Sequence, residues 1–191
     1  MKFNDWNKNL ENGNLWEKKL YEKLSRLLLT INAQIIDYAE NPTWQKKGID
    51  FLLSIGQRTV EQKTRDYQYY WHKDILLETI SVIENNTPGW FYSTEADAVA
   101  YVWKNKEETD IIDGYFIFIT KELRQWINDN EHSFNHIKVH SNNYSSQWST
   151  MNISVPISLF PRENLMQINF VPKIKITKQT KLNIHGEYRN L

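Results

Sequence analysis

The sequence predicts a single α/β domain that spans residues 1–191. The first observation is size, because 191 residues can bury a hydrophobic core without disulfides or structural metals. The second is composition, because 40% hydrophobic residues exclude an intrinsically disordered chain. The third is pattern: one amphipathic helical segment precedes short apolar, β-branched runs that Gly and Pro residues separate.

The first predicted element is an amphipathic helix at residues 15–29. Its apolar residues recur at helical spacing: Trp16, Leu20, Leu24, Leu27 and Leu28. Residues 30–38 are β-branched and apolar and predict a strand, which Asn41-Pro42 ends. Two short strands at residues 49–53 and 59–64 follow, and the Gly-containing connection at 54–58 has the length of a hairpin loop.

The rest of the chain predicts strands, turns and one helix. The polar-aromatic residues 64–73 predict a loop, and the Ile and Val content of residues 75–83 favours a strand over a helix. Residues 87–89 predict a turn, residues 98–103 and 115–120 two strands, and residues 121–128 a short helix with Thr120 as its N-cap. Beyond residue 132 we expect several strands, divided by Pro156, Pro161 and Pro172.

The net charge is zero, but the charges are segregated along the chain. Residues 1–75 carry 12 basic and 10 acidic residues, residues 76–131 carry 4 and 11, and residues 132–191 carry 7 and 2. Zero net charge therefore does not exclude a basic surface that binds nucleic acid. The absence of Cys excludes disulfides, thiolate metal ligands and a Cys nucleophile. With no membrane-length apolar run and no signal-peptide core at the start, we expect a cytoplasmic protein without a membrane partner.

A chemically suggestive pattern lies on the predicted hairpin. Asp50 on the first strand precedes Glu61 and Lys63 on the second. Side chains two residues apart on a strand leave the same face, roughly 6–7 Å apart, so Glu61 and Lys63 are expected side by side. If Ser54 pairs with Gln57, Asp50 lies directly opposite Glu61, with about 5 Å between the Cβ atoms.

Two carboxylates at that distance repel each other, which usually means that a cation lies between them. Oxygen ligands with room for water suit Mg²⁺ or Mn²⁺. Such an ion lowers the pKa of a bound water and stabilises charge on a phosphoryl oxygen, while Lys63 positions the water or neutralises the phosphate. These groups are the equipment for hydrolysing a phosphodiester. The structural alternative is a surface hairpin that carries a Glu–Lys pair.

Gly48-Ile49-Asp50, the short hairpin and Val60-Glu61-Gln62-Lys63 resemble the core of the PD-(D/E)XK nuclease superfamily. One departure is Ile49, which stands where the signature has Pro. The resemblance implies a restriction-endonuclease-like core at about residues 12–130, with a central mixed β-sheet flanked by helices and a β-rich C-terminal extension at about 132–191. It also implies Asp50, Glu61 and the Gln62 backbone carbonyl as metal ligands and Lys63 as the catalytic lysine.

The superfamily often adds an acid from the first helix. On a helical wheel Glu17 lies inside the apolar arc, at about 100° from Trp16, whereas Glu22 lies outside it. Glu17 is therefore the predicted helical metal ligand, although a first-turn carboxylate is also favoured by the helix dipole. Glu78, embedded in the apolar run 75–80, is a second acid that a strand could aim at the site or leave at an exposed edge.

The predicted nucleic-acid contacts flank the motif. They are Lys46, Lys47, Arg65, Tyr67 and Lys73. The first two precede Asp50, and the other three belong to a segment of cations and aromatic residues that suits stacking on unpaired bases and contact with phosphate. The alternatives are a solvated loop for the lysines and a packed loop with half-buried tyrosines for the aromatic segment.

Two further patterns also have ordinary structural explanations. His132, His136 and His140 stand at four-residue spacing, but residues 133–140 alternate like a strand, which favours surface histidines over a metal-binding stripe. The C-terminal lysines predict either a phosphate-binding track or the charged edge of a terminal strand: Lys173, Lys175, Lys178 and Lys181.

The functional hypothesis is a Mg²⁺- or Mn²⁺-dependent endonuclease. DNA is favoured over RNA by the base rate of the superfamily alone, and a homodimer is compatible with cutting both strands. The alternatives are a non-catalytic nucleic-acid-binding or protein-inhibitor module on a nuclease-like fold, and an RNase. Only the aromatic residues at 67–71 favour the RNase, through stacking on splayed bases.

Overall fold

A computed structural model describes residues 13–24, 35–38, 40–53, 58–140, 148–168 and 170. Its strands form two sheets. The first sheet has the order β1-β2-β3-β6-β7-β10, with β1 Ile35–Asp37, β2 Phe51–Leu53, β3 Arg58–Arg65, β6 Ala98–Lys104, β7 Ile111–Phe118 and β10 Leu165–Gln167. The second has the order β5-β4-β9-β8, with β4 Asp74–Val82, β5 Thr87–Pro88, β8 Asn135–His140 and β9 Ser149–Pro156.

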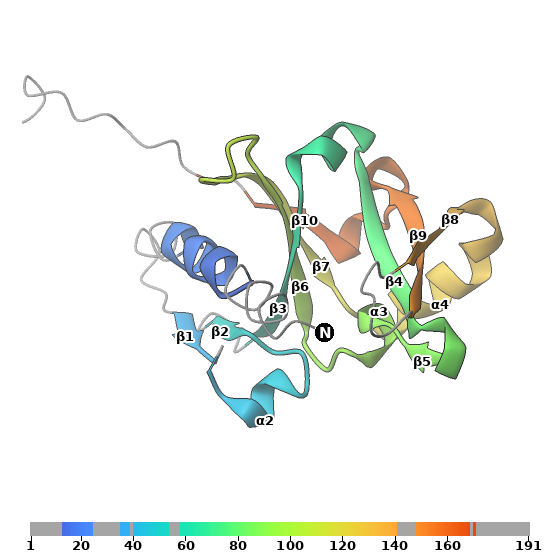
Figure 1. The fold of residues 1–191 in the computed structure, drawn as a ribbon, viewed down its shortest axis with the longest axis horizontal. Coiled ribbons are helices and arrows are strands. Elements are labelled where there is room, and N and C mark those ends of the chain that lie inside the picture. The colour runs from blue at the N-terminus through green and yellow to red at the C-terminus, as the bar shows by residue number, and fades with distance from the viewer. Residues whose placement is uncertain are drawn as a thin grey trace, which may run out of the picture.

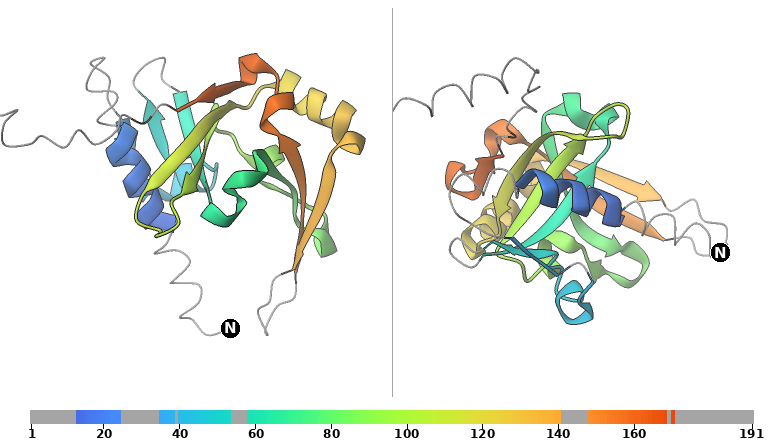
Figure 2. Two further views of the ribbon diagram at one scale, coloured as in Figure 1. Left: turned by 90° about the horizontal axis from the view of Figure 1, so that it is seen from above. Right: turned by 90° about the vertical axis from the view of Figure 1, so that its left-hand side faces the viewer.

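The first sheet is the mixed central sheet of the molecule. Its β3 and β6 pair in parallel, whereas its other neighbours pair antiparallel. The helix at residues 13–24 covers one face, and the second sheet with α4 (Lys121–Asn130) covers the other (Figure 1, Figure 2). The prediction of an α/β fold with a mixed sheet flanked by helices is confirmed.

Alternation along β6 explains how one sheet serves two cores. Ala100 and Val102 face the N-terminal helix, whose Trp16, Leu20 and Leu24 are buried against them. The intervening side chains face the second sheet and pack in the other core: Val99, Tyr101 and Trp103. A strand buried on both faces reads as a continuous apolar run, as residues 98–103 do.

The predicted N-terminal helix is confirmed at residues 15–24, whereas residues 25–29 lie outside the described residues. The hairpin and its register are also confirmed, because Phe51 pairs with Val60 and Leu53 with Arg58. This register is the one that places Asp50 opposite Glu61. Residues 54–57 of the connection lie outside the described residues.

Several local predictions need correction. Residues 67–72 form a 3₁₀ helix rather than an irregular loop, and its Tyr70 packs on Trp103 with 6.1 Å between ring centroids. Thr87–Pro88 is the short strand β5 rather than a turn. The chain reverses just before it, through a 3₁₀ turn at Ile83–Asn85 followed by Asn86 at φ 51°. β7 begins at Ile111, four residues before the predicted strand.

The sequence patterns did not predict two four-residue helices. After the predicted break, Asn41 caps α2 (Pro42–Gln45) with its side chain, and Pro42 occupies the first turn, where its missing N–H has no cost. α3 (Trp90–Ser93) follows Gly89. The predicted cap of α4 is confirmed, because the Thr120 hydroxyl accepts a hydrogen bond from the Leu123 N–H at 3.1 Å.

The C-terminal part is rich in strands, as predicted, but its strands do not stand apart from the rest. β8 and β9 complete the second sheet beside β4, and β10 completes the first sheet beside β7. Short 3₁₀ turns at Glu131–Ser133, Ile157–Leu159 and Arg162–Asn164 connect these elements. Within the described ranges, no helix has the length and apolar character needed to cross a membrane.

Candidate functional site

The β2–β3 hairpin brings the three motif residues together. Asp50 directly precedes β2 and is 7% exposed, and Glu61, opposite it on β3, is 6% exposed. Lys63 lies two residues further along the same face of β3, and its Nζ is 2.5 Å from Glu61 Oε1. Two buried carboxyls and one lysine therefore share one small region of the first sheet.

Asp50 is held by the backbone of β3 and by the last residue of α2. Its Oδ2 accepts the Gln62 backbone N–H at 2.5 Å, and its Oδ1 accepts Gln45 Nε2, from the end of α2, at 3.0 Å. The Gln62 N–H therefore leaves β3 on the side of β2. In a strand the carbonyl of a residue leaves on the same side as its N–H, so the Gln62 carbonyl also points to the side where Asp50 lies.

β2 pairs only with residues 58–60 of β3. Among the described residues, no strand therefore pairs with β3 on this side beyond Val60, and we call residues 61–65 the open edge of β3. The open edge is what lets a side chain, Asp50, take the place of a strand neighbour. Gln62 itself is buried, with 9% of the residue exposed, and it lines a pocket together with Lys63 and Thr64.

The carboxyls of this site have lost much of their hydration. Burial raises the pKa of Asp50, against hydrogen bonds from Gln62 and Gln45 that lower it. Burial likewise raises the pKa of Glu61, against the charge of Lys63. A hydrogen bond from the Thr94 side chain also lowers the pKa of Glu61. Glu61 Oε2 is nevertheless buried, and no hydrogen bond of regular geometry from the described residues reaches it. A buried carboxylate oxygen that is so poorly satisfied is a position that a cation would complete.

The donor set fits a hard cation that keeps part of its water. Among the described residues, no group of three or more His, Cys, Asp or Glu side chains converges closely enough to hold a metal ion. Two carboxylates and a backbone carbonyl are available instead. Mg²⁺ is commonly bound through one or two carboxylates and retains several waters, so these oxygen donors fit it.

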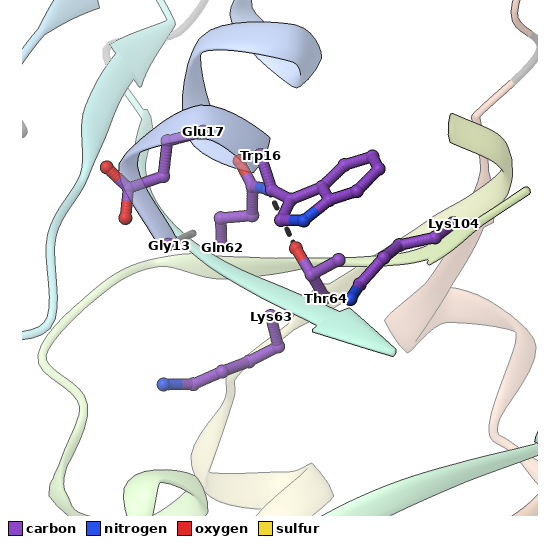
Figure 3. Close-up of a pocket in the computed structure, with 7 residues that line it drawn as sticks. All are labelled: Gly13, Trp16, Glu17, Gln62, Lys63, Thr64 and Lys104. Atoms are coloured by element: carbon purple, nitrogen blue, oxygen red, sulfur yellow. Dashed lines mark hydrogen bonds between the residues drawn. The ribbon is translucent and has the colours of Figure 1, made fainter. Parts of the chain in front are cut away.

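Glu17 approaches the site from the N-terminal helix. Burial, with the charges of Asp50 and Asp37, raises the pKa of Glu17 to about 7, and Lys63 acts in the opposite direction. Figure 3 shows Glu17 and Gln62 on the helix side of β3, whereas Lys63 leaves the opposite face. A pocket of about 250 Å³ collects these residues at the open edge, and it is lined by Gly13, Trp16, Glu17, Gln62, Lys63, Thr64 and Lys104.

Glu78 approaches from the second sheet. Its Oε1 accepts the Trp90 N–H at 3.4 Å, and burial raises its pKa, with Lys63 lowering it and Glu61 raising it further. Lys63 Nζ also lies 5.7 Å from the Trp90 ring centroid. Glu78 on β4 therefore lies within electrostatic range of Lys63 and Glu61. This agrees with the alternative in which a strand aims Glu78 at the site.

The predicted nucleic-acid contacts have different surroundings. Lys46 is exposed beside α2, and Lys47 pairs with Glu95 at 2.8 Å. Tyr67 is half-buried in the 3₁₀ helix, and the exposed Lys73 rests 3.6 Å from the Tyr70 ring centroid.

Arg65 differs from this group because it is buried, with 9% of the residue exposed. Its guanidinium pairs with Asp74 at 2.6 Å and donates to the Asp74 carbonyl at 3.0 Å. Both of these hydrogen bonds come from Nη1 and serve the junction of β3 and β4. The case for phosphate contact accordingly rests on the four other residues.

Sequence patterns alone missed two contributors. Asp37 on β1 pairs with Phe51 and adds negative charge near Asp50 and Glu17. Gly48 adopts φ +68°, and a Cβ there would lie 2.9 Å from Glu61 Oε2. Gly48 belongs to the quoted motif, and a glycine so close to a functional carboxylate is itself a signal that the backbone passes within contact distance.

The remaining sequence patterns stay outside the site. His136 and His140 are exposed on β8, whereas His132 lies in the preceding 3₁₀ turn, as expected for surface histidines. His140 Nδ1 lies 2.9 Å from the Ser149 hydroxyl. The lysine-rich segment at 173–181 lies outside the described residues.

No protein-family model matches the chain, and comparisons with curated proteins and with solved structures gave no match. The functional argument therefore rests on the residues and the geometry of this chain.

Proposed function

We propose that this protein is a metal-dependent nuclease that hydrolyses phosphodiester bonds, with DNA as the first substrate to test. The observation that carries the proposal is the meeting of Asp50, Glu61 and Lys63 on one hairpin, with both carboxyls buried. A hairpin that served only structure would gain nothing from two buried carboxyls beside each other, because desolvating each carboxylate costs free energy.

Each residue has a distinct part in the proposed reaction. Asp50, Glu61 and the Gln62 carbonyl would hold Mg²⁺ or Mn²⁺, which supplies a Lewis acid for the phosphoryl oxygen and lowers the pKa of water. Lys63 places a positive charge beside that region, where negative charge develops on the phosphoryl oxygens during attack. Its Nζ lies 2.5 Å from Glu61 Oε1, and an ammonium group there can donate a hydrogen bond to the phosphate.

Two acids extend this arrangement from outside the hairpin. Glu17, on the N-terminal helix, lies within electrostatic range of Asp50 and Lys63, and Glu78, on β4, within range of Lys63 and Glu61. Among the described residues Glu17 does not converge with Asp50 and Glu61 closely enough for direct binding of one ion, so we assign it as a candidate ligand through a water on the Asp50 side. The preference for DNA rests on the resemblance to the PD-(D/E)XK superfamily, as does the compatibility with a homodimer.

The test compares cleavage of supercoiled, linear, branched and single-stranded DNA and of RNA, with Mg²⁺, Mn²⁺ or EDTA. The variants are Asp50→Asn and Lys63→Met, which retain side-chain volume, and the matched control is Lys138→Met on the exposed strand β8. We expect metal-dependent cleavage that falls at least about 10²-fold in both site variants, the lower range for loss of an acid–base or oxyanion-stabilising group. The control retains full activity.

Thermal unfolding of each variant is measured beside the cleavage assay, so that loss of activity is separated from loss of fold. Cleavage in EDTA, or cleavage that survives both site substitutions in folded protein, contradicts the site assignment. A folded protein that cuts none of these substrates contradicts the enzymatic proposal and favours the non-catalytic binding module.

A further inference from the structure

A second cavity, of about 350 Å³, opens beside the proposed catalytic site. It lies between the end of β3, the 3₁₀ helix Tyr67–His72 and the exposed strand β8. Its walls include the apolar side chains of Leu76, Ile137 and Val139 and the ring of Tyr69. A volume of about 300 Å³ or more with apolar and aromatic walls is typical of a small-molecule or ligand-group pocket.

The cavity and the proposed catalytic site are neighbours along two strands. On β3, Lys63 belongs to the site, and Arg65, two residues later on the same face, lines the cavity. On β4, Glu78 lies within range of Lys63, and Leu76, two residues earlier on the same face, lines the cavity. Thr64 lines both the cavity and the pocket that contains Glu17 and Lys63.

Strand pairing in the second sheet also connects the site to the cavity. Glu78 on β4 pairs with Asn152 on β9, and Asn152 pairs with Ile137 on β8. One row of side chains therefore leads from the acid near Lys63 to the apolar wall of the cavity.

Three apolar or aromatic side chains of the cavity are exposed. Tyr69 is 40% exposed, Ile137 37% and Val139 47%. The Arg65 guanidinium lies 5.1 Å from the Tyr69 ring centroid. An aromatic ring beside a cation is a combination that binds nucleobases by stacking and by cation–π attraction.

The cavity also offers polar groups at its rim. His72 lines it, and the Thr64 backbone N–H leaves β3 on the open edge, two residues after the Gln62 N–H that Asp50 accepts. Such groups read the edge of an unpaired base, whereas a base inside a duplex presents its stacked faces to its neighbours and not to a protein pocket.

We propose that this cavity binds one unpaired nucleobase of the strand whose phosphodiester lies at the Asp50–Glu61–Lys63 site, so that the substrate is single-stranded or locally unpaired nucleic acid. This inference rests on the proposed function for the identity of the strand. It assigns the aromatic segment at 67–72 a role in substrate choice rather than in the chemical step.

The test is equilibrium binding in EDTA, followed by fluorescence anisotropy of labelled oligonucleotides. Three probes share one sequence: a single strand, the full duplex, and the duplex with one unpaired 2-aminopurine. Val139→Glu introduces a carboxylate into the cavity. Its matched control is Leu159→Glu, which adds the same charge at an apolar residue that is 56% exposed and does not line the cavity.

We expect the wild-type protein to bind the single strand at least tenfold more tightly than the duplex, and the unpaired 2-aminopurine to be quenched on binding. Val139→Glu lowers single-strand affinity at least tenfold and duplex affinity less than threefold, whereas Leu159→Glu changes both less than threefold. Tyr69→Phe retains binding, and Tyr69→Ala weakens single-strand binding at least fivefold.

Equal affinity for single strand and duplex, or equal effects of the two Glu variants, overturns the proposal. So does a dimer in sedimentation that Val139→Glu dissociates while single-strand affinity is unchanged, because the cavity wall on β8 would then be covered by a second copy of the chain. Cleavage without single-strand preference removes this inference and leaves the nuclease. Single-strand binding without cleavage in Mg²⁺ removes the nuclease and leaves the base pocket.

Discussion

The buried ion pair between Arg65 and Asp74 gives the sharpest test of how the two sheets are held together. Arg65 ends β3 of the first sheet, and Asp74 begins β4 of the second. Their side chains are 9% and 6% exposed and their charged atoms are 2.6 Å apart. The other oxygen of Asp74 accepts the Ser154 hydroxyl on β9.

Removing one partner of such a pair leaves an uncompensated buried charge. We expect Arg65→Met, which keeps the apolar stem, to lower the free energy of unfolding at pH 7 by about 3–5 kcal/mol. For a protein of this size that corresponds to a decrease in the melting temperature of about 6–20 °C. Asp74→Asn removes the other charge but can still accept from Ser154, so its cost is expected to be smaller.

Urea and thermal unfolding of the two single variants and of Arg65→Met/Asp74→Asn complete a double-mutant cycle. The double variant leaves neither charge buried and is expected to be no less stable than Arg65→Met alone. If Arg65→Met costs less than about 1 kcal/mol, the pair behaves like an exposed ion pair and the reasoning from burial is wrong. If the two single costs simply add, the side chains are not energetically coupled.

Three further predictions address the site and its support. Gly48→Ala is expected to lower the free energy of unfolding by about 1–2 kcal/mol, because Gly48 has a positive φ and an added methyl would crowd Glu61. Gly13→Ala is the control and is not expected to lower it, because no atom lies within 4 Å of the added methyl. Thr120→Ala removes the cap of α4 and is expected to cost about 1 kcal/mol in urea unfolding, whereas Thr120→Ser retains it. Because burial, with nearby carboxylates, raises the pKa of Glu17 to about 7, the folded protein retains a proton that the unfolded chain releases near pH 4.5. The free energy of unfolding in EDTA therefore falls as the pH rises from about 4.5 to 7. Glu17→Gln is expected to make this fall smaller, while Asp50, Glu61 and Glu78, whose pKa values are also raised, still contribute to it, and to be more stable than wild type at pH 8. Parallel pH profiles for the two proteins contradict the assignment.

Residue spacing within short segments predicted the N-terminal helix and the β2–β3 hairpin. Leu20 and Leu24 recur at helical spacing, and the spacing of two short strands was enough to set the register that places Asp50 opposite Glu61. The four-residue helices α2 and α3 are too short to produce a periodic pattern. β5 carries a Pro in a turn-like context, and its strand character comes only from pairing with β4.

In the candidate site, too, the sequence predicted local features but not contacts between distant segments. The helical wheel singled out Glu17, because the arc that faces the sheet is fixed by the helix alone. Arg65 read as a phosphate contact, because a cation on a strand looks the same in sequence whether it is solvated or paired. Its partner Asp74 lies across a change of sheet, and the cavity beside Tyr69 depends on β8, some seventy residues later in the chain. No local pattern contains such long-range contacts.

The order in which the chain visits its two sheets has a consequence for biosynthesis and for unfolding. The chain builds β1–β3 in the first sheet, β4 and β5 in the second, β6 and β7 in the first, β8 and β9 in the second, and finally β10 in the first. Neither sheet is a continuous piece of sequence. The second sheet cannot be completed on the ribosome before residue 156 has been made, and the first not before residue 167.

A chain that stops before residue 165 also leaves the β7 edge that β10 normally pairs with uncovered, and an unpaired edge promotes association between chains. In native-state hydrogen exchange, the amides of β4 and β9 are therefore expected to share one protection level with those of β3 and β6. The chain passes back and forth between the two sheets, so one sheet cannot open without disturbing the strands of the other.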